Sequence, residues 1–301
     1  MTIALFGYSH FTRECARALQ DNGFAVALFC PRNDEPLFRE ADMPSLNLPV
    51  TWFEGMEDAA LTNALDALRP EFILSIIFNH AIPESITRKA RKAALNVHPA
   101  PLPQMRTATV WFWPLRLGLT QSEICVHHLN PQMDGGPVIL RFPFSLGLND
   151  TQGTHAAKLT RLAPRLMKTL APVLNSEPFP EGEPQAAGTW YPPVRETDLW
   201  IDFTEPSESI RNLVRACNPF HPARTAFRSL TLGIHEIECP DSSPPSTQPG
   251  ELLVGKDGLW VSCGDRAARL TVVAVPGEGV FSAERFVALY RVENGERLVS
   301  G

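Results

Sequence analysis

Short apolar runs separated by amphipathic stretches mark the first part of the chain. Each run is four to seven residues long and rich in β-branched or aromatic residues, which is typical of buried strands; the runs are TIALFG, FAVALFC, VTWF and EFILSII. The intervening stretches 11–22 and 58–68 predict helices, the first of which ends at Gly23. This alternation predicts an α/β fold with a Rossmann-like, doubly wound, mostly parallel sheet.

The middle of the chain continues with a different pattern. A short basic helix is expected over 83–92, and a helix interrupted by Pro114 over 109–118. The runs EICVHHL and PVILRFPF predict two adjacent strands that bracket a tight turn at Asp134. A long helix should follow over 151–174, with a kink or break at Pro164.

A change of composition divides the chain after this helix. The stretch SEPFPEGEPQAAGTWYPPV is rich in Pro, Gly and Glu and predicts a linker. Beyond a helix at 207–216, several short β-like runs and a hairpin signal at Asp257-Gly258 predict a small, OB-like β-barrel. We therefore expect a catalytic domain over 1–178, a linker over 179–200 and a C-terminal barrel over 201–301.

Length, charge and cysteine usage narrow the class of protein. A chain of 301 residues exceeds the usual single domain, and its net charge of −6 builds in no strong attraction to nucleic acid or membranes. The six cysteines form no CxxC pair, so neither a zinc site nor a disulfide framework is indicated.

Without a signal peptide or an apolar run of about 18 residues, the expected location is the cytoplasm. The first turn holds only Gly7 of the three glycines of a dinucleotide fingerprint, which argues against NAD.

The candidate chemistry lies between positions 94 and 138. Asn96 and His98 end an apolar run and enter a proline-rich loop, and Asp134 lies 36 residues after the histidine in an MDGG turn. Because proline restricts its own φ and the residue before it, this loop should hold a site rigidly. His127 and His128 alternate along a strand, so one should face the core and the other the site. A metal site formed by a histidine and Asp134 is the minor alternative.

These residues resemble a known signature. Asn96-Val97-His98, the following Leu102-Pro103, Arg106 and Met133-Asp134-Gly135-Gly136 are similar to the active-site motifs of the folate-dependent formyltransferases, which include glycinamide ribonucleotide, methionyl-tRNA and amino-sugar formyltransferases. The resemblance covers nearly the whole chain, because IDFTEPSESIRNLVRACNPF at 201–220 is similar to the start of the C-terminal domain of the methionyl-tRNA and aminoarabinose types.

The resemblance implies a formyl transfer from N10-formyltetrahydrofolate to an amine, without a metal. Asn96 and His98 would donate hydrogen bonds to the oxyanion of a tetrahedral intermediate, each worth about 3–4 kcal/mol, and Asp134 would stabilise the imidazolium and accept the amine proton. The implied pterin pocket is lined by Leu74, Ile76, Ile77, Phe78 and His80 and by Met133 and Gly135 of the later loop. Met105, Arg106 and Thr107 would face the acceptor, although Arg106 is equally read as a surface charge.

The acceptor is the open question. The chain departs from the family pattern at several positions. Thr107 replaces the usual glycine and Ala100 the usual small serine. Ser122-Glu123 replaces a Thr-Gly pair, and Cys125 replaces a threonine. The tRNA enzyme should carry a basic, glycine-containing insertion, whereas residues 31–50 lean acidic and contain no glycine. We therefore favour a small-molecule amine or hydroxylamine, such as a nucleotide-linked amino sugar or an amino-acid-derived metabolite. Methionyl-tRNA, hydrolysis of the formylfolate by water and a non-catalytic folate-binding role remain alternatives, and the oligomeric state is unknown.

Overall fold

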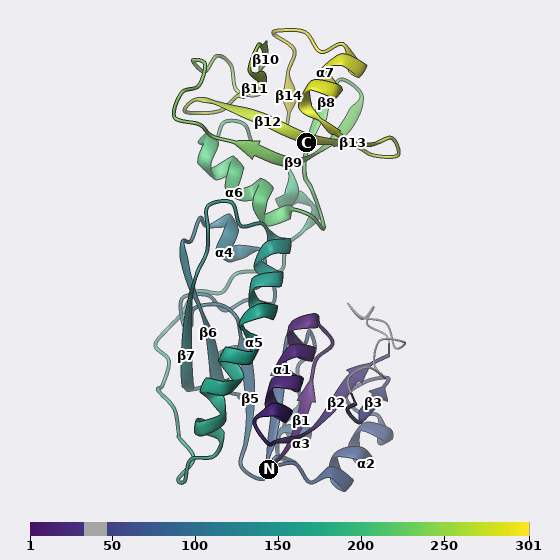
Figure 1. Ribbon diagram of the computed structural model, residues 1–301, viewed down its shortest axis with the longest axis vertical. Helices are drawn as coiled ribbons and strands as arrows, with labels where there is room; N and C mark the ends of the chain where they lie inside the picture. Colours follow the sequence, from purple (N-terminus) through teal and green to yellow (C-terminus); the bar gives the residue numbers. More distant parts are fainter. Residues whose placement is uncertain (33–46, 301) are drawn as a thin grey trace. The chain divides into compact units, whose positions relative to one another are not determined.

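The computed structural model describes residues 1–32 and 47–300 (Figure 1). Most of the acid-leaning segment 31–50 therefore lies outside the described residues. The contacts divide the chain into two compact units. Unit 1 comprises 1–110, 121–145 and 156–192, and unit 2 comprises 111–120, 146–155 and the chain from 193 onward.

Unit 1 is built on one sheet of seven strands in the order β3-β2-β1-β4-β5-β6-β7. Strands β1 to β5 are parallel, and β6 and β7 are added antiparallel at one edge, which confirms the predicted α/β class. The elements are β1 (Thr2–Phe6), α1 (His10–Asp21), β2 (Ala25–Pro31), β3 (Val50–Phe53), α2 (Ala59–Leu68), β4 (Phe72–Ile76), α3 (Glu84–Thr87), β5 (Ala93–His98), β6 (Gln121–His128), β7 (Val138–Ser145) and α5 (Gln152–Leu174).

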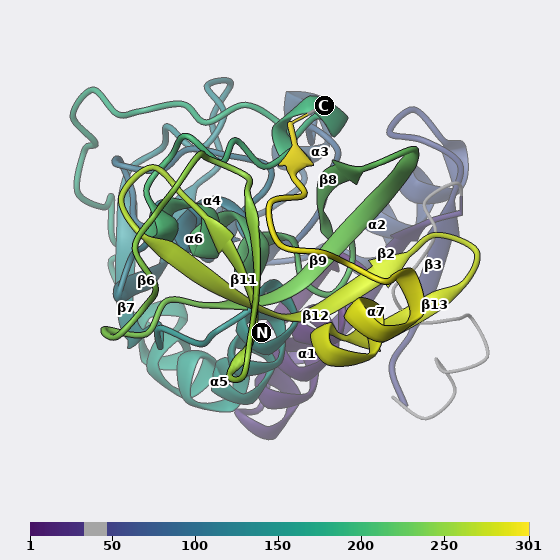
Figure 2. The same cartoon turned by 90° about the horizontal axis from the view of Figure 1, so that it is seen from above.

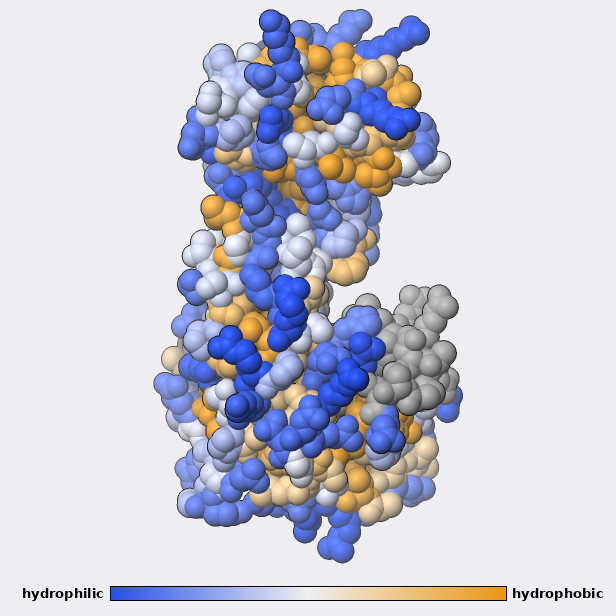
Figure 3. Space-filling model, viewed as in Figure 1, coloured by the Kyte–Doolittle hydropathy of each residue, from blue (hydrophilic) through white to orange (hydrophobic). Residues whose placement is uncertain are grey.

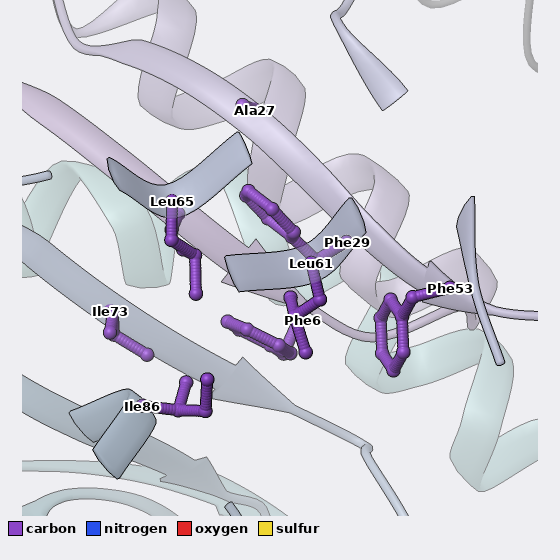
Figure 4. Packing of buried hydrophobic residues seen from close by; sticks show 9 residues of the cluster. Phe6, Ala27, Phe29, Phe53, Leu61, Leu65, Ile73 and Ile86 are labelled. Carbon is purple, nitrogen blue, oxygen red and sulfur yellow. The ribbon is translucent and has the colours of Figure 1, made fainter. Parts of the chain in front are cut away.

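An aromatic core holds one face of this sheet against α2 (Figure 4). The Phe6 ring stacks on Phe29 at 5.2 Å between centroids and meets Phe53 edge-on at 6.1 Å. Leu61 and Leu65, one helical turn apart on α2, are fully buried in the same cluster. The apolar runs of the sequence thus form the sheet interior, and burying each such side chain contributes roughly 1.5–3 kcal/mol.

Unit 2 contains an antiparallel sheet in the order β10-β11-β12-β9-β8-β14, with β13 paired to β12. Figure 2 shows its long paired strands β9 and β12 side by side. The ends of the sheet meet, because Leu252 exchanges main-chain hydrogen bonds with Glu296 and Gly295, and Leu298 donates to the Gly250 carbonyl. The sheet therefore closes into a small barrel. The elements are α4 (Trp113–Arg116), α6 (Ser207–Cys217), β8 (Ala223–Phe227), β9 (Leu230–Glu238), β10 (Leu252–Gly255), β11 (Gly258–Ser262), β12 (Ala267–Val275), β13 (Gly279–Ser282), α7 (Ala283–Tyr290) and β14 (Leu298–Val299), with a 3₁₀ turn at Glu196–Leu199.

Three details of the expected elements are wrong. The basic helix at 83–92 is a single turn, α3, and Pro114 lies at the start of α4 rather than interrupting a longer helix. Helix α5 is not broken at Pro164, since its buried positions Leu159, Ala163, Leu166, Leu170 and Leu174 outweigh a proline cost of about 3 kcal/mol. The hairpin signalled at Asp257-Gly258, in contrast, is present: β10 and β11 pair Gly255 with Gly258, and Lys256 and Asp257 form the loop between them.

Candidate active site

The structure brings Asn96, His98 and Asp134 together at the carboxyl end of β5. Asn96 and His98 are the last alternating residues of that strand, and Asp134 belongs to the loop between β6 and β7. The Asn96 Nδ2 donates to Asp134 Oδ1 at 3.3 Å, and His98 Nδ1 lies 3.6 Å from the same oxygen. Ligands of open α/β sheets bind outside the carboxyl ends of the strands, so this is the expected place for a site.

A fourth group, His127, completes the cluster. It faces Asn96 across the antiparallel pair of β5 and β6, with its Nε2 3.2 Å from Asn96 Nδ2 and 3.7 Å from Asp134 Oδ1. The neighbouring His128 instead bonds the Pro180 carbonyl at 3.0 Å. Strand alternation indicated that one of the two histidines faces the site, and the structure selects His127. The sequence did not predict that it contacts Asn96.

Main-chain carbonyls determine where the imidazole protons sit. A carbonyl only accepts, so His98 Nε2, 2.9 Å from the Met105 carbonyl, carries a proton. His127 Nδ1 likewise donates to the His128 carbonyl at 2.9 Å, which leaves its Nε2 lone pair to accept from Asn96. Both hydrogens of the Asn96 amide are then engaged, one by His127 and one by Asp134.

Burial and neighbouring charges shift the pKa of both His98 and Asp134. Burial lowers the pKa of His98, against the opposing effects of the Asp134 carboxylate and the Met105 carbonyl. For Asp134, burial raises the pKa, but His98, His127 and the Thr107 main-chain N–H together leave it below the ordinary value. At neutral pH the carboxylate is therefore ionised and His98 is neutral, with an unprotonated Nδ1 facing the carboxylate.

The Asp134 turn is held in an unusual backbone conformation. Asp134 has φ of 50°, in the left-handed region, and its Oδ2 accepts from the Thr107 main-chain N–H at 3.2 Å. Two residues later the chain passes so close to His128 that a Cβ on Gly136 would lie 1.8 Å from the His128 carbonyl oxygen. Gly136 is therefore needed for the close approach of the turn to β6.

The loop expected to face the acceptor is buried rather than exposed. Met105, Arg106 and Thr107 are 2%, 8% and 2% exposed, so the reading of Arg106 as a surface charge is wrong. The Arg106 guanidinium donates to Gln185 Oε1 at 3.1 Å and to the Ala186 carbonyl at 3.2 Å. Among the described residues its Nε has no hydrogen-bond partner.

The departures at Glu123 and Cys125 form a structural unit. Arg141 Nη1 donates to Glu123 Oε1 and to the Leu102 carbonyl, both at 2.6 Å. Burial raises the pKa of the Cys125 thiol to about 12, so this side chain stays protonated. The Glu123–Arg141 pair thus fixes the start of the loop that carries Met105.

The residues proposed to line a pterin pocket lie in different environments. Leu74 and Ile76 have no exposed surface and pack within the sheet, while Ile77, with φ of 48°, begins the loop that follows β4. The Phe78 ring lies 5.2 Å from His80 and joins the aromatic core. On the other loop, Met133 is 55% exposed, and the Gly135 main-chain N–H donates to the Gln132 carbonyl at 3.0 Å. Ligand contacts of Leu74 and Ile76 would have to use their main chain.

The described residues contain neither a metal-binding cluster nor a membrane-spanning helix. No group of three or more His, Cys, Asp or Glu side chains in 1–32 and 47–300 is placed to hold a metal ion. Within the same residues, no helix combines the length and apolar character needed to cross a membrane.

The chain thus combines an α/β domain, which carries an Asn–His–Asp cluster at the end of β5, with a small β-barrel domain. Family models match both parts: "Formyl transferase" over residues 1–170, and "Formyl transferase, C-terminal domain" over 193–291. The chain belongs to the formyl transferase family and is an enzyme of one-carbon formyl transfer.

Similar proteins match most of the chain, across both units. A methionyl-tRNA formyltransferase of Bacillus licheniformis is 25% identical over 309 residues, covering 98% of this chain and 97% of that protein. One of Geobacter metallireducens is 28% identical over 253 residues, covering 83% and 80%.

Solved structures share the fold at low identity. HypX from Aquifex aeolicus, in complex with tetrahydrofolic acid, has a TM-score of 0.67 and 14% identity over 98% of this chain; the chain spans only 48% of HypX. An N-formyltransferase from Helicobacter canadensis, in complex with folinic acid and dTDP-3-aminofucose, has a TM-score of 0.67 and 14% identity, covering 89% of this chain and 98% of that one.

Proposed function

We propose that this enzyme transfers the formyl group of N10-formyltetrahydrofolate to the amine or hydroxylamine of a small molecule. The observation that carries the proposal is the convergence of Asn96, His98, His127 and Asp134 around one carboxylate oxygen at the end of β5. Folate ligands named in the related HypX and Helicobacter structures support the donor. Six cysteines without a disulfide agree with a cytoplasmic location.

In the proposed reaction the amine attacks the formyl carbon, loses a proton, and N10 of the folate gains one as its bond to the carbon breaks. His98 Nδ1 is unprotonated at rest and faces Asp134, so the two groups together can take up that single proton and return it to N10. The formyl oxygen must draw one Asn96 N–H away from Asp134 or His127. The hydrogen bond from Asn96 to the formyl oxygen then forms as negative charge develops on that oxygen.

The charge of the C-terminal part of unit 2 supports a small acceptor. Residues 193–301 contain eleven Lys and Arg against fifteen Asp and Glu. Much of the positive charge is already neutralised by carboxylates in this unit, in the pairs Arg211–Glu208, Arg224–Glu196, Arg228–Glu296, Arg266–Glu208 and Arg269–Glu238. Hydrophobic groups also interrupt its surface on the face shown in Figure 3. Because phosphate contacts dominate nucleic-acid affinity, this surface disfavours tRNA.

Methionyl-tRNA is the second candidate acceptor. The observation in its favour is the end-to-end match, over both units, with methionyl-tRNA formyltransferases of about 25% identity. The location of the expected tRNA-contacting insertion, between β2 and β3, falls largely outside the described residues.

One assay separates these candidates. The purified chain is incubated with N10-formyltetrahydrofolate and, in turn, nucleotide-linked amino sugars, amino-acid-derived amines and hydroxylamines, methionyl-tRNA, or no acceptor, while tetrahydrofolate release is followed. We expect release with a small amine and none with methionyl-tRNA. Efficient formylation of the tRNA would overturn the proposed acceptor, and free formate without any acceptor would indicate a hydrolase. Asp134→Asn is the control that should reduce each catalysed reaction to a small residual rate.

A further inference from the structure

A segment that the composition identifies as linker runs along the active-site loop. We call residues 183–191 the strap. At one end, the main chains of Glu183 and Val138 exchange two hydrogen bonds of 2.8 Å. At the other end, the main-chain N–H of Arg106 donates to the Thr189 carbonyl at 3.0 Å, and the Arg106 main-chain carbonyl accepts from the Tyr191 N–H at 2.9 Å. The strap is thus fixed both to the start of β7 and to the loop that holds His98.

Between these two ends, Gln185 reaches the Asp134 turn. Its Nε2 donates to the main-chain carbonyls of Asp134 and Gly136, at 2.9 and 2.7 Å. Its Oε1 accepts from Arg106 Nη2 at 3.1 Å. Carbonyls only accept and a guanidinium only donates, so this set of partners allows one orientation of the amide.

The turn is consequently clamped from two sides. The Thr107 main-chain N–H holds the Asp134 carboxylate, while Gln185, oriented by Arg106, holds the carbonyls on either side of Gly135. A left-handed φ at a non-glycine residue costs about 1 kcal/mol or more and persists only where its surroundings impose it. Without the Gln185 amide, one of these two restraints on Asp134 is lost.

We propose that Gln185 is a positioning residue of the formyl transfer reaction, which acts by holding the Asp134 carboxylate against Asn96 and His98. It contacts neither reacting atom. The inference rests on the proposed function for the role of Asp134 and goes beyond it, because it assigns the strap to the active site.

The kinetic test uses the full chain with Gln185→Ala and Gln185→Glu. A glutamate carboxylate keeps the size of the side chain and its attraction to Arg106 but cannot donate to the two carbonyls. Since small misplacements of a catalytic group cost up to 100-fold, we expect kcat to fall roughly 10- to 100-fold in both variants, with the KM of the amine changed less than about twofold. Glu181→Ala, at an exposed position four residues earlier, is the control and should match the wild type.

A double variant tells positioning from a general structural role. If Gln185 acts through Asp134, the double variant Gln185→Ala/Asp134→Asn should have the same residual kcat as Asp134→Asn alone. The proposal would be overturned if the kcat losses of the two single variants multiplied in the double variant. An unchanged kcat in Gln185→Ala and Gln185→Glu would also overturn it. Should Gln185→Ala fail to fold by circular dichroism, the isosteric Gln185→Glu carries the same comparison.

A titration of His98 by NMR tests the proposal without any turnover. Asp134→Asn defines how the His98 ring titration moves when the carboxylate is lost, and Gln185→Ala should move it in the same direction. A titration identical to the wild type would overturn the proposal. If the wild type transfers formyl to no acceptor, the proposed function fails, and this measurement still decides whether Gln185 positions Asp134.

Discussion

At the residue scale, the Met105 carbonyl decides how His98 meets its carboxylate. By accepting from Nε2 it turns the unprotonated Nδ1 towards Asp134, and the burial of the ring keeps it neutral near pH 7. A sequence reading that makes His98 an imidazolium donor at rest overlooks this burial. Neutral histidine beside an ionised carboxylate is instead ready to receive a proton.

The same burial predicts a pH dependence of stability. The pKa of His98 lies below about 6.5 in the folded chain, so under pH 6.5 the unfolded chain binds a proton that the fold does not. This contribution is fully present above about pH 6.5 and is lost as pH falls toward the lowered pKa. The unfolding free energy, measured by urea titration, should therefore fall more steeply from pH 6.5 to 5 in the wild type than in His98→Gln. The two slopes should agree above pH 7, and equal slopes throughout would contradict the prediction.

At the element scale, the turn between β6 and β7 carries the tightest steric requirement of the site. A Cβ on Gly136 would lie 1.8 Å from a main-chain oxygen of β6, whereas the atoms nearest to a Cβ on Gly135 belong to the Gln132 side chain, at 2.7–2.8 Å. Backbone cannot yield as a flexible, exposed glutamine can. The two adjacent glycines therefore form a matched pair with different expected costs.

Gly136→Ala should destabilise the protein by about 1–3 kcal/mol through overpacking, and Gly135→Ala by much less. The measurement is the melting temperature of both variants under identical conditions. Equal melting temperatures would show that the turn does not approach His128 as closely as described. The comparison needs no knowledge of the acceptor, because it depends only on stability.

The elements also show what the sequence pattern can and cannot predict. Short apolar runs predict the strands from β1 to β7, because that signal is local in the sequence, and the polar residues at the end of β5 predict the cluster that we propose as the active site. The pattern makes helix α3 too long and does not reveal β8, β13, β14 or α7, since those short segments take their form from their neighbours. Gln185 could not be found in a Pro- and Gly-rich stretch, as its role depends on partners 49 and more residues away.

At the scale of the whole molecule, ligand binding is the broadest test of the donor. A folate that binds the folded chain and not the unfolded one must raise its unfolding free energy, by about 2.7 kcal/mol at a concentration one hundred times Kd. For a chain of this length that corresponds to a rise of a few degrees in melting temperature, increasing with the logarithm of concentration. We expect such a rise with 5-formyltetrahydrofolate and none with aminobenzoylglutamate, which has the same acidic tail without the pterin. An unchanged melting temperature at millimolar 5-formyltetrahydrofolate would contradict the folate donor, since a site that binds it cannot leave stability unaffected.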